Sequence, residues 1–79
     1  MFFDFTEEYL FTRNTETNKN LLMINLQNYE TITHQNFLNG EEIWWIKANK
    51  KNKCIIISSY GFFKGCLVDY QGNKLSSYP

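Results

Sequence analysis

Residues 41–53, with the sequence EEIWWIKANKKNK, have the clearest potential for binding chemistry because they combine two adjacent tryptophans with four lysines. Single-stranded nucleic acid is commonly held by aromatic side chains that stack on its bases beside a positively charged groove. An aromatic anchor surrounded by polar groups is equally typical of a protein-binding surface. The segment therefore predicts noncovalent binding, and its residue types leave both kinds of partner open.

The lysines of this segment are the candidate contacts to a negatively charged partner. Lys50, Lys51 and Lys53 belong to the tip of a predicted hairpin, where they would reach phosphate groups or the acidic surface of a protein. The net charge of zero and the single arginine count against nucleic acid. Lysines at a hairpin tip also keep sheet edges unpaired. We therefore expect a protein partner rather than nucleic acid.

Charge is distributed unevenly along the chain. Residues 1–42 carry seven acids against two basic residues, whereas residues 43–79 carry six lysines against Asp69 alone. Such an asymmetry can give a bipolar surface that steers a charged partner, or two halves that fold onto each other and neutralise. We favour the second, structural interpretation.

The residue types that catalysis or metal binding needs are sparse. His34 is the only histidine, and Cys54 and Cys66 are twelve residues apart without a CxxC motif, so Cys and His alone cannot assemble a structural zinc site. The sequence also has no nucleophile elbow and no glycine-rich phosphate loop. We expect no catalytic residue, no metal site and no cofactor, with both cysteines packed as small core residues and His34 in a loop.

Length and composition describe one small globular domain that spans residues 1–79. With 18% aromatic residues and Ala48 as the only alanine, large rings must provide much of the buried area. The longest apolar runs have four residues, whereas a membrane-spanning helix needs about twenty. The acidic N-terminal segment also differs from a signal peptide. We expect a cytosolic protein without a membrane span.

The first half of the chain alternates between predicted strands and loops. Residues 1–14 fit either a helix or a strand, and their Phe, Tyr and Thr content favours a strand. The polar residues 14–20 predict a loop, and residues 21–27, LLMINLQ, predict a strand. Residues 28–40 fit neither period, so we expect a short helix or an irregular loop that ends at an Asn-Gly pair.

The second half predicts an antiparallel meander. IWWIKA and KCIIIS flank the loop NKKN, and FFKGCLVDY and LSSY follow, separated by QGNK. Short runs rich in Ile, Val, Trp, Tyr and Phe between Asn and Gly residues are typical of strands and turns. The sequence therefore predicts a mainly β fold, either a small open barrel or a curled antiparallel meander, with at most one short helix. An α+β fold is the alternative.

The hairpin within residues 43–59 places the two tryptophans on opposite faces, because successive side chains of a strand alternate. With residues 49–52 as the loop, Trp45 pairs with Ile56. One face then carries the expected core residues, which are Trp44, Ile46, Ala48, Ile55 and Ile57. The other face is mixed, and its candidate partner-binding residues are Ile43, Trp45, Lys47 and Ile56. The alternative is that the N-terminal aromatic residues cover this second face as another layer.

Abundant Asn, Lys, Ile and aromatic residues in a short chain give a composition that resembles the small proteins of AT-rich phages and mobile elements. Inhibitors of host defence, such as anti-CRISPR proteins, are frequent among these. The resemblance assigns no site residue, but it implies a protein that occludes a larger partner. We therefore expect a non-catalytic protein-binding module, an inhibitor or adaptor. The alternatives are a binder of single-stranded nucleic acid and a self-associating, dimeric structural protein.

Overall fold

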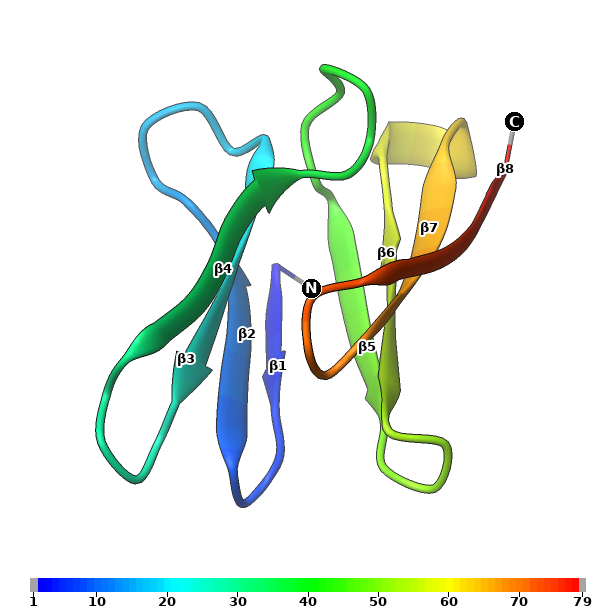
Figure 1. Cartoon of the computed structure of the whole chain (residues 1–79). Helices are drawn as coiled ribbons and strands as arrows, with labels where there is room; N and C mark the ends of the chain where they lie inside the picture. The colour runs from blue at the N-terminus through cyan, green and yellow to red at the C-terminus, as the bar shows by residue number, and fades with distance from the viewer. Residues whose placement is uncertain (1, 79) are drawn as a thin grey trace.

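The computed structural model describes residues 2–78, apart from the side chain of His34, and these residues form two four-stranded antiparallel sheets. The N-terminal sheet consists of β1 (Phe3–Phe5), β2 (Tyr9–Arg13), β3 (Asn20–Asn25) and β4 (Thr31–Asn36), paired in that order (Figure 1). The C-terminal sheet consists of β5 (Trp45–Asn49), β6 (Cys54–Ser58), β7 (Gly65–Asp69) and β8 (Lys74–Tyr78). The short 3-10 helix η1 (Tyr60–Phe62) joins β6 to β7. The predicted mainly β fold is confirmed, and each sheet is an antiparallel meander.

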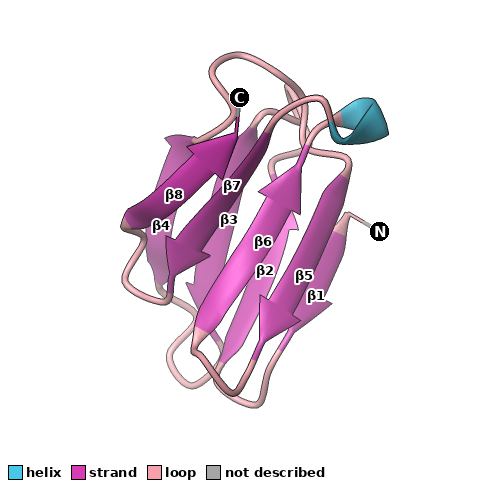
Figure 2. Ribbon diagram, turned by 90° about the vertical axis from the view of Figure 1, so that its right-hand side faces the viewer, coloured by secondary structure: helices cyan, strands magenta, loops and turns pink. Residues whose placement is uncertain are grey.

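The two sheets pack face to face, with each strand of the C-terminal sheet lying over a strand of the N-terminal sheet (Figure 2). Because side chains alternate along a strand, every second residue points into the space between the sheets. Buried side chains from both sheets fill this space, and they form one cluster that includes Phe11, Leu21, Met23, Ile46, Ile55, Ile57, Cys66 and Val68. A single core therefore holds the two sheets together.

The sheets also meet along one side, where β1 lies beside β5. The Asp4 carboxylate accepts a 2.7 Å hydrogen bond from the backbone amide of Ala48. This amide lies on the edge strand of its sheet, so the carboxylate takes the place that a neighbouring strand would fill. The contact closes one edge of the C-terminal sheet without an added strand.

Strand β4 corrects the prediction for residues 28–40. A short helix or irregular loop was expected, but residues Thr31–Asn36 pair with β3. The strand was missed because β4 is an edge strand with mostly exposed side chains, so its sequence lacks apolar alternation. His34 consequently lies in a strand rather than in the expected loop.

The β5–β6 hairpin has the predicted faces but a different register. Asn49 pairs with Cys54, and Trp45 pairs with Ser58 rather than Ile56. The loop therefore spans residues 50–53, and the Asn49 side-chain oxygen accepts the backbone amides of Lys51 and Asn52. A shift that moves the pairing by an even number of residues leaves every side chain on its predicted face. Four predicted core residues accordingly point inward, namely Ile46, Ala48, Ile55 and Ile57.

Ile43 and Trp44 exchange the places that the sequence predicted for them. Ile43, expected on the exposed face, is fully buried, whereas Trp44, expected in the core, is 40% exposed. The cause lies outside the hairpin, because the Ile43 amide donates to the carbonyl of Asn18 and its carbonyl accepts from Arg13. These contacts turn Ile43 into the core just before β5 begins. Both assignments from the hairpin pattern were wrong.

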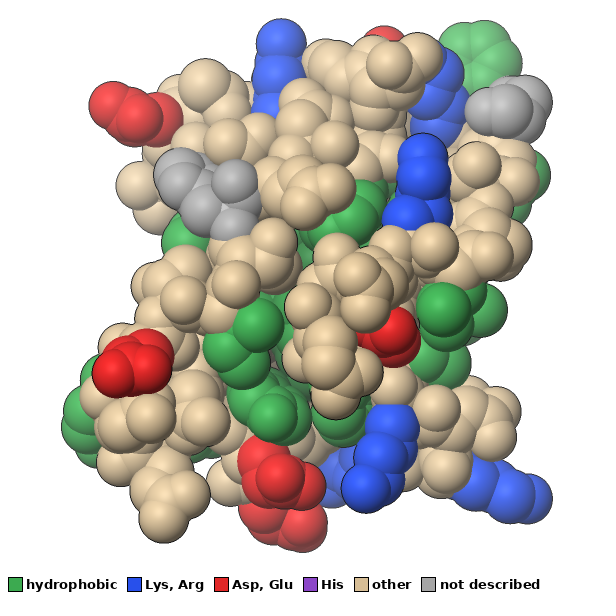
Figure 3. Space-filling model, viewed as in Figure 1, with side chains coloured by type: hydrophobic (Ala, Val, Ile, Leu, Met, Phe, Trp, Pro, Cys, Tyr) green, Lys and Arg blue, Asp and Glu red, His purple; other side chains and the backbone are tan. Residues whose placement is uncertain are grey.

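The two halves of the chain that differ in charge fold as two separate sheets. In Figure 3 the acidic side chains lie mainly over the N-terminal sheet, whereas most lysines lie over the C-terminal sheet. The sheets themselves pack against each other through apolar side chains. Cys54 and Cys66 are buried free thiols, as expected for small core residues. Burial raises the pKa of the Cys66 thiol, and the positive charge of Lys74 opposes this change.

Candidate functional site

Exposed aromatic side chains gather at one end of the C-terminal sheet. They come from the N-terminal segment, from the start of β5 and from the turn between β6 and β7. We call this cluster the aromatic surface, and its members are Phe2, Trp44, Trp45, Tyr60, Phe62 and Phe63. Each side chain is between 40% and 76% exposed. A globular monomer seldom exposes so many large rings together unless the surface binds something.

Contacts between the rings join five of these six residues into two groups, one around Trp44 and one formed by Trp45 and Phe62. The Trp44 ring lies 5.5 Å from the ring of Phe2 and 5.1 Å from the ring of Tyr60, measured between centroids. Trp45 makes a similar contact with Phe62 at 6.4 Å. All three pairs are edge-to-face, the geometry that aromatic quadrupoles favour. The rings therefore support one another while their outer surfaces remain open to solvent.

Arg13 fixes the part of the aromatic surface that precedes β5. Its guanidinium carbon lies 3.7 Å from the centroid of the Phe2 ring and 5.8 Å from that of Trp44. Its Nη1 atom also donates a 2.7 Å hydrogen bond to the carbonyl oxygen of Ile43. A planar guanidinium can stack on a ring and donate in its own plane at the same time. Arg13 thus ties strand β2 to the backbone that carries Trp44.

The turn that carries Tyr60, Phe62 and Phe63 is closed by its own hydrogen bonds. The amide of Ser59 donates to the carbonyl of Lys64, and the amide of Lys64 donates back to the Ser59 hydroxyl. Phe62 has a positive φ of 59°, a conformation that costs a side-chain-bearing residue about 1–2 kcal/mol. The closed turn holds this strained backbone and displays the rings before any partner is present.

The outer face of the C-terminal sheet continues the aromatic surface away from Trp45. One cross-strand row contains Trp45, Ser58, Gly65 and Tyr78, and the next contains Lys47, Ile56, Leu67 and Ser76. The Tyr78 ring covers Gly65 so closely that an added Cβ would overlap it. A cavity of about 230 Å³ opens beside this ring, with Ile56 and Leu67 in its walls. This face therefore offers apolar area next to the exposed rings.

Ser58, in the same cross-strand row as Trp45 and Tyr78, is a buried polar residue. Its hydroxyl oxygen is buried and has no hydrogen-bond partner within the described residues. A buried polar group without a partner costs about 1–3 kcal/mol.

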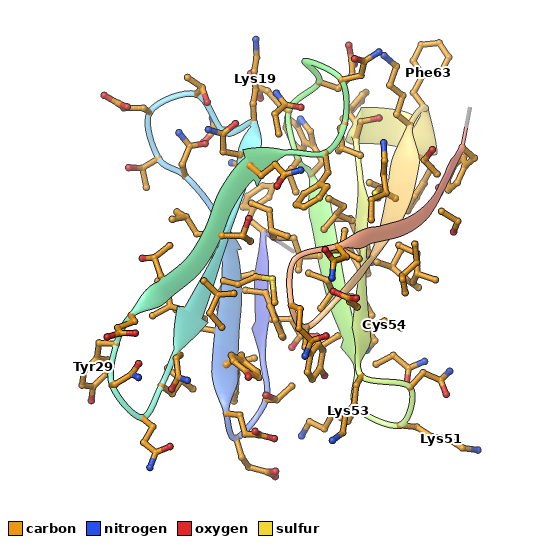
Figure 4. The ribbon with its side chains drawn as sticks, in the orientation of Figure 1. Lys19, Tyr29, Lys51, Lys53, Cys54 and Phe63 are labelled. Atoms are coloured by element: carbon orange, nitrogen blue, oxygen red, sulfur yellow. The ribbon has the colours of Figure 1, made fainter. Side chains whose placement is uncertain are left out.

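The predicted partner-binding residues are brought together only in part. Trp45, Lys47 and Ile56 are exposed on one face of the C-terminal sheet, as predicted, whereas Ile43 is buried and unavailable to a partner. The hairpin lysines, Lys51 and Lys53 among them, lie at the end of the sheet opposite to Phe63 (Figure 4). Since β5 spans five residues, the lysine loop is about 16 Å from Trp45 along the strand. The aromatic and lysine parts of the predicted site are separate.

The aromatic turn is the part of the site that the sequence interpretation missed. From the sequence, the glycines around residues 62–64, FFK, predict a bend and a close backbone approach within a curled sheet. A usable signal was nevertheless present, because Phe62 and Phe63 lie between Gly61 and Gly65, and Tyr60 directly precedes the first glycine. A tight turn projects from the surface, so rings within it have little chance of burial. The pattern of rings within a glycine-bounded turn therefore indicates exposed aromatic side chains.

Among the described residues, no group of three or more His, Cys, Asp or Glu side chains is placed to hold a metal ion. The same part of the chain has no helix long and apolar enough to cross a membrane. Burial raises the pKa of Tyr70, but this ring packs in the core against Phe11. The feature with a clear chemical use is therefore the exposed aromatic surface, which suits noncovalent binding.

Comparison with known proteins identifies no relative of this chain. No protein family matches it, and neither a curated protein nor a solved structure gives a significant match. The geometry and chemistry of the aromatic surface are therefore the basis for a functional proposal.

Proposed function

We propose that this protein is a non-catalytic protein-binding module that covers a surface of a larger partner with its aromatic surface. The observation that carries the proposal is the set of contacting, half-exposed rings around Trp44, stacked against Arg13 and held by a closed turn. Trp, Tyr and Arg dominate the binding energy of protein interfaces. Preorganised rings also lose little conformational entropy when a partner binds.

The surroundings of the rings support a protein partner more than nucleic acid. Glu41 and Glu42 are exposed directly before Ile43 and line a cavity with Trp44, so carboxylates border the rings. Carboxylates repel phosphate, whereas nucleic-acid sites place cationic groups beside the stacking rings. The three lysines that were candidates for phosphate contact lie at the far end of β5. A nucleic-acid binder of this size would need the stacking rings and the lysines side by side.

The biological setting is part of the same proposal. The composition that resembles small phage and mobile-element proteins supports an inhibitor or adaptor, including an inhibitor of host defence. Two buried free thiols are compatible with action in the cytosol, where thiols stay reduced. A module of 79 residues that covers one surface would block access to the site beneath it.

Affinity capture with matched variants tests the proposal. Phe63 and Tyr29 are 76% and 78% exposed but lie at opposite corners of the molecule (Figure 4). Phe63→Ala should reduce recovery of a specific, nuclease-resistant protein partner at least ten-fold, because truncating an interface anchor costs about 2 kcal/mol or more. Tyr29→Ala should leave recovery unchanged. Equal recovery with both variants would contradict the proposed role of the aromatic surface.

Two further measurements address the alternatives. Light scattering during size-exclusion chromatography would reveal a homodimer, and loss of that dimer in Phe63→Ala would replace the partner with a second copy of the chain. Anisotropy of a labelled single-stranded oligonucleotide would reveal nucleic-acid binding. Tight binding that is lost when Lys50, Lys51 and Lys53 are changed to Gln would contradict the protein-binding proposal.

A further inference from the structure

A cavity beside the aromatic surface combines aromatic rings with carboxylates. It has a volume of about 300 Å³ and is lined by Lys19, Gly40, Glu41, Glu42, Trp44 and Tyr60. These residues come from the β2–β3 loop, the connection between β4 and β5, and η1, which lie at the same end of the molecule in Figure 1. The volume is at the lower limit of ligand pockets, so the cavity suits one side chain rather than a large ligand.

Trp44 and Tyr60 both line this cavity, and their rings contact each other edge to face. The planes of Trp44 and Tyr60 are inclined by 68°, and their centroids are 5.1 Å apart. The face of an aromatic ring carries negative potential, and a cation within about 6 Å of the centroid is attracted to it, most strongly by Trp. The same Trp44 ring already has the Arg13 guanidinium 5.8 Å from its centroid. Ring walls of this kind favour a positively charged group.

The charges of the lining also favour a cation. Glu41 and Glu42 contribute two carboxylates, whereas Lys19 contributes one ammonium group. In Figure 4 the Lys19 side chain extends away from the body of the molecule, so its charge lies toward the rim. Among the lining side chains carboxylates outnumber ammonium groups two to one, and the charges of Lys19 and of Arg13 near Trp44 would both weaken the attraction in part.

The backbone that carries these groups is held in place. The amide of Glu41 donates to the carbonyl of Leu38, and Ile43, which precedes Trp44, is fastened through both its amide and its carbonyl. Leu38 and Ile43 are buried, so the segment is anchored in the core on both sides of the two glutamates. The amide of Lys19 donates to the side-chain oxygen of Asn14. The cavity is thus built before a ligand arrives.

We propose that this cavity binds a cationic side chain, Lys or Arg, of the protein partner. This inference rests on the proposed function, because the side chain belongs to the same partner that covers the aromatic surface. A phosphate or carboxylate would face Glu41 and Glu42, and an apolar side chain would leave both carboxylates without compensation. A cation is stabilised by the rings and by the carboxylates together.

A nuclear magnetic resonance titration with short peptides tests this site directly. The probes are a peptide with one central lysine, the same peptide with arginine, and a control in which norleucine replaces lysine. The lysine and arginine peptides should shift the Trp44 indole signal and the Tyr60 ring signals, with binding that weakens as salt rises. The Trp45 indole is the internal reference. Equal shifts with the norleucine peptide would overturn the inference.

Variants that remove a charge from the cavity should change its affinity for the lysine peptide in opposite directions, depending on the sign of that charge. Glu41→Gln with Glu42→Gln should weaken binding of the lysine peptide, whereas Lys19→Gln should strengthen it, each by about two- to five-fold. Trp44→Leu should remove the binding, and the unchanged amide spectrum of β6 and β7 would show that the fold persists. An affinity for the lysine peptide that is unchanged by all three charge substitutions would overturn the inference.

Two comparisons separate this inference from its alternatives. Tetramethylammonium that binds more tightly than the lysine peptide would indicate a small quaternary amine as ligand and overturn the assignment to a partner side chain. A captured complex that is lost in Phe63→Ala but retained in the Glu41→Gln, Glu42→Gln double variant would overturn the cationic site. That result would leave the proposed function standing. A complex that survives both variants would contradict the proposed function itself.

Discussion

Arg13 and Ile43, thirty positions apart in the sequence, are joined by a 2.7 Å hydrogen bond from the guanidinium Nη1 to the carbonyl oxygen. The bond crosses from strand β2 of one sheet to the residue that precedes Trp44. It therefore couples the N-terminal sheet to the aromatic surface. The orientation of Trp44 depends on a residue that the hairpin sequence does not contain.

Arg13→Lys should weaken both the fold and the binding surface. Lysine keeps the positive charge but cannot stack on Phe2 and donate to Ile43 in one geometry. We expect a loss of about 1 kcal/mol in the free energy of unfolding, measured by urea denaturation, and a changed environment of the Trp44 indole. An unchanged indole signal would show that Arg13 does not position this ring.

The residues around the start of β5 should differ in their effects on stability. Ile43 is fully buried, so Ile43→Ala should cost about 2–5 kcal/mol. Trp44 and Trp45 are half exposed, and the Ala variant of either should cost less, about 1 kcal/mol. Thermal denaturation of the three variants gives the order of their losses in stability. A tryptophan variant as damaging as Ile43→Ala would mean that its ring is a core residue.

Gly65 and Tyr78 should be energetically coupled. An added Cβ at Gly65 would overlap the Tyr78 ring, which is half exposed and can move aside. Gly65→Ala should therefore displace the ring and cost some stability, whereas the same change in a Tyr78→Ala background should cost less. A double-mutant cycle should give a coupling of about 0.5–1 kcal/mol. Additive effects would indicate that the ring does not rest on the glycine.

The β7–β8 turn should weaken in acid. The Asp69 carboxylate accepts the backbone amides of Asn73 and Gln71, and the hydrogen bond from Asn73 is the main cause that lowers its pKa. A lowered pKa in the folded state stabilises the fold above the ordinary aspartate pKa of about 4. This contribution disappears as pH falls through the lower, folded value. Asp69→Asn should reduce the acid dependence of the melting temperature. An unchanged dependence in this variant would mean that other carboxylates cause it.

The sequence predicts those parts of the fold that depend on local pattern. The two-residue period of a strand placed Ile46, Ile55 and Ile57 in the core even though the loop position was wrong, because the error was an even number of residues. The pattern also placed Trp45 and Ile56 on one exposed face. Local alternation is thus enough for the interior of a hairpin.

Features that depend on contacts between distant segments could not be predicted in this way. The reversal of Ile43 and Trp44 requires Arg13, at the end of β2, and Asn18, in the β2–β3 loop. Strand β4 pairs with β3 through its backbone while most of its described side chains stay exposed, so composition carries little signal. The cavity near Trp44 likewise joins three segments that are separate in the sequence.

Hydroxyl-radical footprinting of the captured complex tests the proposed binding surface most directly. Radicals oxidise exposed aromatic rings, so the free protein should be modified both at the aromatic surface and at Tyr29. In the complex, we predict strong protection of Trp44, Tyr60 and Phe63 and unchanged oxidation of Tyr29. Unchanged oxidation of the aromatic surface, with protection at Tyr29 or elsewhere, would contradict the claim that the partner binds these rings.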